Sequence, residues 1–269
     1  MVFGANYTVP KMIKDTVDKY PEVYAQYKRL PNNEFEPITY RDMFQYGMDF
    51  GAALISIGVK KEDKIGLISD NRAEWQQADI GIMAIGAIDV PRGCDATIID
   101  LEKILSITEA QIVIAENNSQ VRKILSLKDK LPALKTFICF ENDVKPETAD
   151  LAKEKNVEII YFSEMLKIGQ KWRIENKGKV EELMEEGKAD DVATIIFTSG
   201  TTGDPKGVVL THNNFLAQLD ELPERIFVNP GDKALSVLPI WHVFEREVEY
   251  VIMIQAGTIC YSKPVGSIL

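Results

Sequence analysis

One short loop constrains this chain more than any other part of its sequence. Residues 192–197 read VATIIF, an apolar and β-branched run typical of a buried strand, and the run stops at Thr198. The following segment, SGTTGDPKG at residues 199–207, contains three glycines, which let backbone N–H groups approach a ligand closely. Its hydroxyls are suitable donors to phosphate oxygens, and Lys206 adds a mobile positive charge. A strand followed by such a loop indicates a phosphate-binding site.

A flexible connector and a Walker A loop are the two alternatives for this segment. A connector rarely resumes at once as a strand-like run such as GVVLT, which occupies residues 207–211. Walker A requires the pattern G-x-x-x-x-G-K-[ST]. Counting from Gly200 places Pro205 where the second glycine belongs and Gly207 where the hydroxyl belongs. We therefore reject Walker A for this loop.

The loop resembles the signature loop of the adenylate-forming superfamily, which includes acyl-CoA synthetases, luciferases and the adenylation domains of peptide synthetases. The resemblance rests on TSGTTGDPKG at residues 198–207. A second segment, LPIWHVFER at residues 238–246, is similar to the next motif of the family in its long-chain fatty acyl-CoA synthetase form. Family members are much longer than these 269 residues, so the resemblance implies the N-terminal portion of such an enzyme.

The resemblance implies roles for residues of both motifs. The loop would hold the β and γ phosphates of ATP, and the hydroxyl of Thr198 would also ligate Mg²⁺, which prefers oxygen ligands. His242 would be catalytic, beside the acyl carboxylate, and Val243 would border the nucleotide. From the residues alone, a packed and hydrogen-bonded role for His242 beside Trp241 stays open. The implied cofactor-binding residues are Thr198, Ser199, Gly200, Thr201, Thr202, Gly203, Lys206 and Val243.

The implied reaction has two steps. A fatty-acid carboxylate attacks the α-phosphate of ATP to give acyl-adenylate and pyrophosphate, and the thiol of coenzyme A then accepts the acyl group. Neutralising the charge on the leaving pyrophosphate is the main catalytic task. ATP, Mg²⁺, a fatty acid and coenzyme A are therefore the expected ligands.

Other parts of the family's active site are expected to be missing from this chain. The glutamate that completes the Mg²⁺ site, the ribose-binding aspartate and the adenylation lysine belong to motifs that this sequence lacks. We therefore expect negligible ligase activity from the chain alone, and a missing C-terminal half or a separate complementing polypeptide as its partner. The alternative is a non-catalytic nucleotide- or acyl-binding module that acts through a partner. Homo-oligomerisation stays open, because unpaired edges and apolar surface are expected near residues 235–240.

Alternating patterns predict an α/β fold, with the doubly wound sheet layers of an adenylate-forming N-terminal domain in truncated form. Two capping boxes are predicted, Asn71 with Glu74 and Thr97 with Asp100. The expected strands are residues 64–69, 87–91, 111–116, 136–141, 157–162, 192–197 and 235–240, and the expected helices include 73–86 and 99–108. Three parts are expected. Residues 1–59 would be an N-terminal helical segment that belongs to a second subdomain, and residues 60–235 would be an α/β subdomain with the phosphate loop. Residues 236–269 would be the incomplete start of the second subdomain.

Composition restricts the partners. A net charge of −10 argues against a nucleic acid or an anionic membrane as the main partner, and leaves membrane contact at most peripheral. The first residues do not have the pattern of a signal peptide, and no apolar run is long enough to span a bilayer, so we expect a cytoplasmic protein. The acidic run at residues 180–191 indicates a solvated helix and linker rather than a metal site.

Several other residues are expected to have structural rather than catalytic roles. The cysteines are widely spaced and support neither a disulfide nor a zinc site, so we expect buried free thiols at Cys94, Cys139 and Cys260. Glu245 and Arg246 are expected to pair with each other or with neighbours at a surface or interface. Apolar residues of the first helix are expected to be core, namely Trp75, Ile80, Met83 and Ile85.

Overall fold

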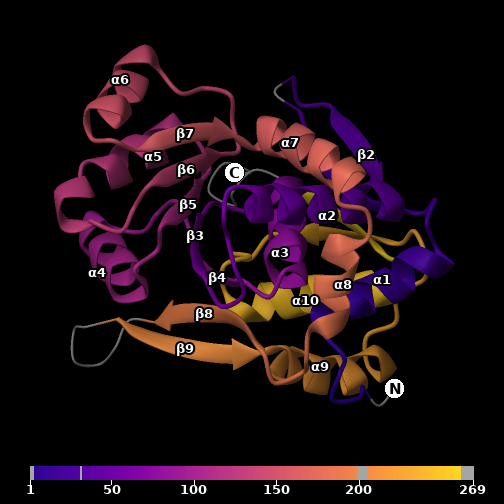
Figure 1. The fold of residues 1–269 in the computed structure, drawn as a ribbon. Coiled ribbons are helices and arrows are strands. Elements are labelled where there is room, and N and C mark those ends of the chain that lie inside the picture. The colour runs from indigo at the N-terminus through magenta and orange to yellow at the C-terminus, as the bar shows by residue number, and fades with distance from the viewer. Residues whose placement is uncertain (1–2, 31, 199–204, 262–269) are drawn as a thin grey trace.

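The computed structural model describes residues 3–30, 32–198 and 205–261, which form two β-sheets surrounded by helices (Figure 1). The larger sheet has the strand order β7-β6-β5-β3-β4-β8-β9, parallel throughout except for the antiparallel pair β8 and β9. Its strands are β3 (Lys64–Ile68), β4 (Ile88–Arg92), β5 (Ile112–Ala115), β6 (Thr136–Cys139), β7 (Glu158–Tyr161), β8 (Val192–Thr198) and β9 (Lys206–Thr211).

Helices cover both faces of this sheet. Figure 1 shows α4, α5 and α6 on one side and α2, α3 and α7 on the other, and a separate cluster of buried apolar residues lies under each group. This arrangement confirms the expected doubly wound α/β fold. The helices are α2 (Tyr40–Ser56), α3 (Ala73–Ala84), α4 (Ile98–Thr108), α5 (Asn118–Leu125), α6 (Pro146–Glu154), α7 (Phe162–Glu175) and α8 (Lys179–Glu186), with a short 3₁₀ turn η1 (Lys128–Lys130).

The smaller sheet joins the two ends of the described chain. Its order is β10-β11-β1-β2, with β11 parallel to both β10 and β1, and β2 antiparallel to β1. Residues 1–59, which we expected to be a helical segment, therefore also contain the strands β1 and β2. The elements of this part are α1 (Val9–Lys19), β1 (Tyr24–Arg29), β2 (Phe35–Thr39), α9 (His212–Glu221), η2 (Leu222–Glu224), β10 (Lys233–Ser236), α10 (Val243–Ile254) and β11 (Thr258–Tyr261).

Local signals gave mixed results. The box at Thr97 is confirmed, because its hydroxyl accepts the N–H of Asp100 at 3.1 Å and its own N–H donates to the Asp100 carboxylate at 3.3 Å. The box at Asn71 is wrong. Arg72 is the N-cap of α3 and makes no side-chain cap, while the Asn71 side chain is engaged by a distant segment described below. The expected strand 235–240 is also too long, since β10 ends at Ser236 before Pro239.

The core around α3 is as expected, and it depends on close helix packing. Trp75, Ile80, Met83 and Ile85 are all buried. Helix α7 crosses α2 at Gly169, where an added Cβ would lie 1.6 Å from the carbonyl oxygen of Asp49. Among the described residues, no helix combines the length and apolar character needed to cross a membrane.

Candidate active site

The loop predicted to bind phosphate connects the antiparallel strands β8 and β9. Thr198 at the end of β8 is the cross-strand partner of Lys206 at the start of β9, and both residues are exposed. The hairpin therefore holds the two ends of the TSGTTGDPKG segment side by side. The remaining loop residues of the predicted site, Ser199, Gly200, Thr201, Thr202 and Gly203, lie outside the described residues.

Strand β8 is anchored on both sides. It pairs with β4 through Asp89 and Thr194, and its own Ile196 and Phe197 are buried. Because β8 runs parallel to β3, β4, β5 and β6, the loop leaves from the edge formed by the carboxyl ends of these strands. Open α/β sheets bind ligands in the crevice outside this edge. The fold thus places the loop at the edge where a ligand site is expected.

His242 lies at the start of α10, close to the same edge. It is the N-cap of the helix, and its Nδ1 accepts the backbone N–H of Phe244 at 3.4 Å. The preceding Trp241 packs against the end of β4, with its ring 4.7 Å from the guanidinium of Arg92. A Cβ at Gly93 would lie 2.2 Å from the Trp241 Nε1, so only glycine allows this contact. Trp241 thereby holds the exposed His242 beside the strand that neighbours β8.

The segment before His242 is held by Asn71 from the end of β3. Its Nδ2 donates to Ser236 Oγ and to the carbonyl oxygen of Leu238, both at 2.6 Å, and its Oδ1 accepts the N–H of Ile240 at 2.9 Å. Glu245 accepts the N–H of Val237 at 3.2 Å. These bonds replace the ladder that a longer β10 would form, and they explain why Asn71 does not cap α3. The side chain of Asn71 is a positioning group that the sequence did not reveal.

A buried carboxyl group supports the same segment from the other side. Glu249 accepts hydrogen bonds from Ser236 Oγ at 2.7 Å, Gln76 Nε2 at 2.8 Å and Tyr261 Oη at 3.0 Å. Burial raises the pKa of Glu249 from 4.5 to about 7, although these hydrogen bonds act to lower it. The carboxyl group therefore keeps its proton over a pH range in which an exposed glutamate is ionised.

Glu249 is expected to make stability depend on pH. Its folded-state pKa is raised, so its contribution is complete below pH 4.5 and is lost as the pH rises to about 7. The shift from 4.5 to about 7 corresponds to a loss of about 3 kcal/mol. We expect Glu249→Gln to gain stability relative to the parent between pH 4.5 and 7.5 in urea unfolding curves. Glu36→Gln, at an exposed position, serves as the control and should follow the parent; equal profiles for both variants would contradict the expectation.

Arg246 is buried in the interior. The expectation that Glu245 and Arg246 lie at a surface or interface is therefore wrong. Its guanidinium is fully buried and donates to Asp79, to Asp89 at 3.1 and 3.2 Å, and to Tyr250 Oη at 2.8 Å. Burial raises the pKa of Asp79 to about 7, against the lowering effect of Arg246. The backbone N–H of Arg246 also donates to the His242 carbonyl at 3.3 Å. One buried cation thus connects α10 with α3 and β4 and fixes the helix that begins at His242. Glu245 is buried as well and does not pair with it.

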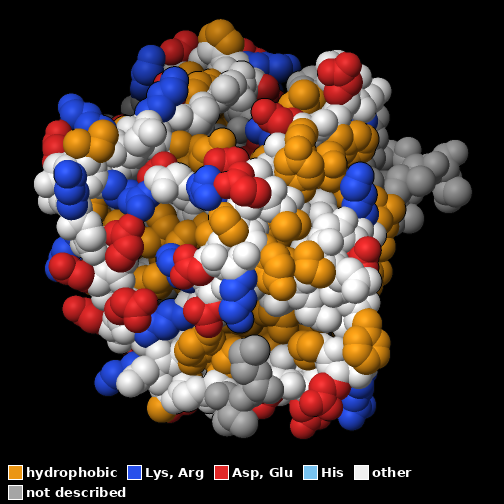
Figure 2. All heavy atoms as spheres, turned by 90° about the vertical axis from the view of Figure 1, so that its right-hand side faces the viewer, with side chains coloured by type: hydrophobic (Ala, Val, Ile, Leu, Met, Phe, Trp, Pro, Cys, Tyr) orange, Lys and Arg blue, Asp and Glu red, His pale blue; other side chains and the backbone are white. Residues whose placement is uncertain are grey.

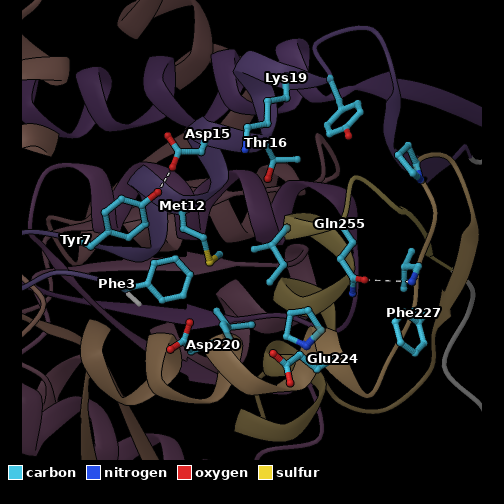
Figure 3. A pocket seen from close by; sticks show the side chains of 16 residues that line it. Phe3, Tyr7, Met12, Asp15, Thr16, Lys19, Asp220, Glu224, Phe227 and Gln255 are labelled. Atoms are coloured by element: carbon cyan, nitrogen blue, oxygen red, sulfur yellow. Dashed lines mark hydrogen bonds between the residues drawn. The ribbon is translucent and has the colours of Figure 1, made fainter. Parts of the chain in front are cut away.

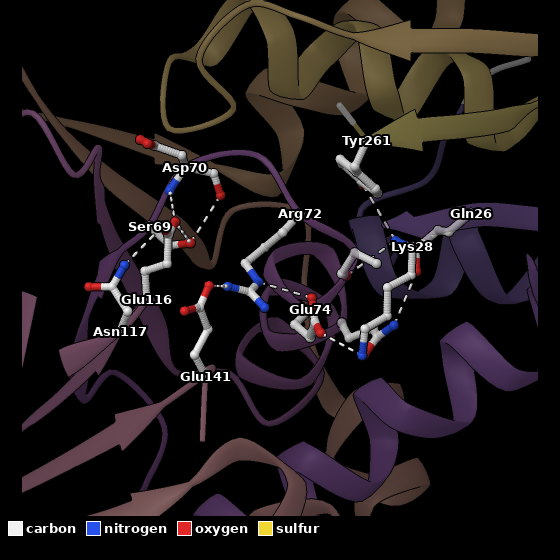
Figure 4. A network of polar contacts seen from close by, with 12 residues as sticks. Gln26, Lys28, Ser69, Asp70, Arg72, Glu74, Glu116, Asn117, Glu141 and Tyr261 are labelled. Atoms are coloured by element: carbon white, nitrogen blue, oxygen red, sulfur yellow. Dashed lines mark hydrogen bonds and ion pairs between the residues drawn. The ribbon is translucent and has the colours of Figure 1, made fainter. Parts of the chain in front are cut away.

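A polar crevice of about 780 Å³ opens at the carboxyl ends of β3, β5 and β6 (Figure 4). Arg72 pairs there with Glu74 at 2.9 Å and Glu141 at 3.3 Å, and Lys28 from β1 pairs with Glu74 at 2.8 Å. Burial acts to raise the pKa of Glu74, but Arg72 and Lys28 outweigh it and hold that pKa at about 2. These pairs connect β1 with α3 and with the ends of β3 and β6. Further charged residues line the crevice, namely Arg29, Asp70, Glu116 and Asp143.

The comparisons with known proteins agree with this geometry. Residues 13–267 match the family described as AMP-binding enzyme. The chain belongs to this family. It is 34% identical over 253 residues to the probable acyl-activating enzyme 16, chloroplastic, of Arabidopsis thaliana, covering 91% of this chain and 34% of that protein. It is 24% identical to the long-chain-fatty-acid–CoA ligase ACSBG2 of Xenopus laevis, over 96% of this chain and 34% of that one. The chain spans about a third of the length of these relatives.

Solved structures show the same fold. The N-terminal domain of FACL13 from Mycobacterium tuberculosis superposes with a TM-score of 0.73 at 23% identity, over 96% of this chain and 57% of that one. The adenylation domain of a carboxylate reductase from Mycobacterium chelonae gives a TM-score of 0.76 at 16% identity, over 95% and 42% of the two chains. The family resemblance and the fold expected from the two motifs are therefore confirmed.

The described residues fit the ligands of this family in part. The Thr198 hydroxyl and the Lys206 ammonium are exposed and suit a phosphate with its hard cation. A second group, formed by Asp70, Cys94 and Glu116, has ligand-type atoms within 4.8 Å of one another. Burial and the nearby carboxylates raise the pKa of the Cys94 thiol.

The cysteines differ in part from expectation. All three are free, but only Cys139 is buried, whereas Cys94 and Cys260 are half-buried. Cys94 lies in the loop after β4, and Cys260 is the residue of β11 that is not fully buried.

Proposed function

We propose that this chain is the N-terminal part of an ATP-dependent long-chain fatty acid–CoA ligase. The observation that carries the proposal is the pairing of Thr198 with Lys206 across the hairpin that bears the family loop, at the carboxyl edge of the sheet. His242 lies beside β4, the strand next to β8, so the two motifs meet at one edge. Membership of the AMP-binding enzyme family and the names of the relatives support the same chemistry.

The chain's own residues would bind and orient the reactants. Lys206 and the loop residues 199–203 would neutralise the β and γ phosphates, and Thr198 would help to hold Mg²⁺, which supplies further neutralisation of the leaving pyrophosphate. Because the Nδ1 of His242 accepts the N–H of Phe244, a neutral His242 carries its proton on Nε2. This Nε2–H can donate to a carboxylate oxygen and orient it. Val243, which is 36% exposed beside it, would border the nucleotide.

A further polypeptide segment is part of the proposal. Electrostatic catalysis needs hydrogen-bond donors that are fixed around the reacting groups from several sides. This chain would supply the donors on one side only. We therefore propose that the chain is inactive alone and that transfer to coenzyme A depends on a C-terminal part. Strand β10 is an end strand of its sheet, and the exposed Leu235, Val237 and Leu238 lie on it or directly after it. This edge supports the proposed partner, which is a C-terminal segment, a complementing polypeptide or a second copy of the chain.

Fatty-acid-dependent ATP–pyrophosphate exchange tests the proposal, with the chain alone and with a C-terminal polypeptide of the family added. We expect exchange only in the second case, and a loss of about 100-fold in Lys206→Ala, as for removal of one transition-state donor. Thr198→Ala should weaken the Mg²⁺ dependence. Lys171→Ala, at an exposed position of α7, is the matched control.

Three outcomes would change the conclusion. Exchange by the chain alone would contradict its proposed inactivity. Exchange that survives Lys206→Ala would remove the loop from the site. Saturable ATP binding without exchange under any condition would favour the non-catalytic binding module.

A further inference from the structure

A second cavity lies away from the ends of β8 and β9 that Thr198 and Lys206 occupy. It is formed by α1, by α9 with η2, and by residues 227–230 with the end of α10, and its volume is about 570 Å³ (Figure 3). In Figure 1, α1 and α9 lie far from the end of β8 and the start of β9. Small-molecule sites have volumes of about 300–1,000 Å³. The cavity is therefore large enough for a ligand of its own.

The floor and one wall of this cavity are apolar. Met12 and Leu219 are 3% and 1% exposed and form part of its base. The rings of Phe3 and Tyr7 are stacked with centroids 5.0 Å apart, while Phe227 at the rim is 85% exposed. Figure 2 views the molecule from the side of α1 and shows hydrophobic side chains gathered between charged ones. A ligand here would bury aromatic surface that water now contacts.

Hydrogen bonds from the Gln255 side chain hold the wall that bears Phe227. Gln255 donates to the carbonyl oxygens of Ile226 at 2.9 Å and Val251 at 3.2 Å, and its Oε1 accepts the N–H of Val228 at 3.2 Å. The side chain thus uses its hydrogen-bonding capacity to fix residues 226–228 against α10. The cavity is a formed feature of the fold, and a ligand would meet an ordered wall.

Acidic groups give the cavity its charge preference. Asp15 projects from α1 and Glu224 from η2, so carboxylates come from two different walls (Figure 3). Asp220 is a further acidic lining residue, and Lys19 is the basic one among the described residues that line the cavity. The Tyr7 hydroxyl donates to Asp15 and fixes it. Burial raises the pKa of Asp15, with Lys19 opposing, so a second cation near it would be favourable.

We propose that this cavity binds a small organic cation, an amine with an aromatic body, whose ammonium faces Asp15 and whose body packs on Phe3 and Met12, while Glu224 adds negative charge from the opposite wall. Aromatic faces attract such cations in addition to the carboxylates. Nucleotides and fatty acids carry the opposite charge and are disfavoured by the same groups. The site is separate from the proposed adenylation site, and its test does not depend on ligase activity.

Tryptamine and indole-3-propionate are suitable probes, because they share an indole body and a two-carbon linker but carry opposite charges. We expect saturable tryptamine binding in a ¹H–¹⁵N NMR titration, with shifts at residues 12–19 and 219–228, and binding of indole-3-propionate weaker by about ten-fold or more. Asp15→Asn should weaken tryptamine binding about three- to ten-fold, and added salt should weaken it as well.

The controls make the outcome decisive. Asp18→Asn removes the same charge from the same helix and from a likewise exposed position, but Asp18 pairs with Lys14 at 2.6 Å and does not line the cavity, so binding should not change. Glu224→Gln repeats the test from the opposite wall if Asp15→Asn disturbs α1. Equal affinity for the two probes, equal effects of Asp15→Asn and Asp18→Asn, or no saturable binding of tryptamine at millimolar concentration would each overturn the proposal.

Discussion

Arg246→Met is expected to lower the free energy of unfolding by about 3–5 kcal/mol at pH 7, because it leaves buried carboxylates without their counter-charge. Arg246, Asp79 and Asp89 are all fully excluded from solvent, so water cannot replace the guanidinium. Burial already raises the pKa of Asp79 to about 7. The carboxyl groups can therefore take up protons as the pH falls, and the loss should be smaller at pH 5 than at pH 7.

Guanidinium unfolding curves at both pH values would measure this loss. Arg41→Met is the matched control, since Arg41 pairs with the exposed Glu22 at 2.6 Å and should contribute less than about 1 kcal/mol. Adding Asp79→Asn to Arg246→Met should recover part of the loss by removing one uncompensated charge. A loss in Arg246→Met no larger than in Arg41→Met would show that the buried cation does not hold α10 in place.

Gly169→Ala is expected to destabilise the protein by about 3 kcal/mol or more, at the upper end of overpacking effects. Alanine favours a helix over glycine by about 1 kcal/mol, so an exposed substitution of this kind would stabilise. At this position the added Cβ would lie 1.6 Å from the Asp49 carbonyl oxygen and 3.0 Å from the Ala53 nitrogen. Both are backbone atoms of α2, so α7 must move away as a whole and loosen the ion pair between Arg173 and Asp49, now at 2.6 Å.

Thermal and urea unfolding of Gly169→Ala would measure this cost. Gly4→Ala is the control, because nothing lies within 4 Å of a Cβ added there, and its stability should stay within about 0.5 kcal/mol of the parent. An increase in stability in Gly169→Ala would mean that α2 and α7 are packed less closely than the structure indicates.

Much of the larger sheet could be predicted from the sequence because its strands are local signals. A parallel strand buried on both faces is a continuous apolar run, and the runs at residues 64–69, 111–116 and 192–197 are each bounded by polar residues. The capping box at Thr97 is equally local, since both partners lie within one turn. The family motif at residues 198–207 was evident for the same reason. Its glycines, hydroxyls and lysine are contiguous in the chain.

The support of the candidate site could not be predicted in this way. Asn71 has the sequence environment of a helix cap, yet its hydrogen-bond partners are Ser236, Leu238 and Ile240. These partners follow it by more than 160 residues, and no local pattern announces them. The roles of Thr198, Lys206, His242 and Val243 remain predictions, which the pyrophosphate-exchange experiment can test.

The sequence by itself determined the family and the α/β class, because both depend on short contiguous segments with strong backbone preferences. Only the tertiary structure decided that Arg246 is an interior cation, that Asn71 fixes the segment before His242 and that a cavity with acidic lining residues lies beside α1. The physical reason is the same for all three. Burial and pairing depend on residues that are distant in the sequence. The local sequence around a charged residue therefore does not show whether its side chain faces water or the core.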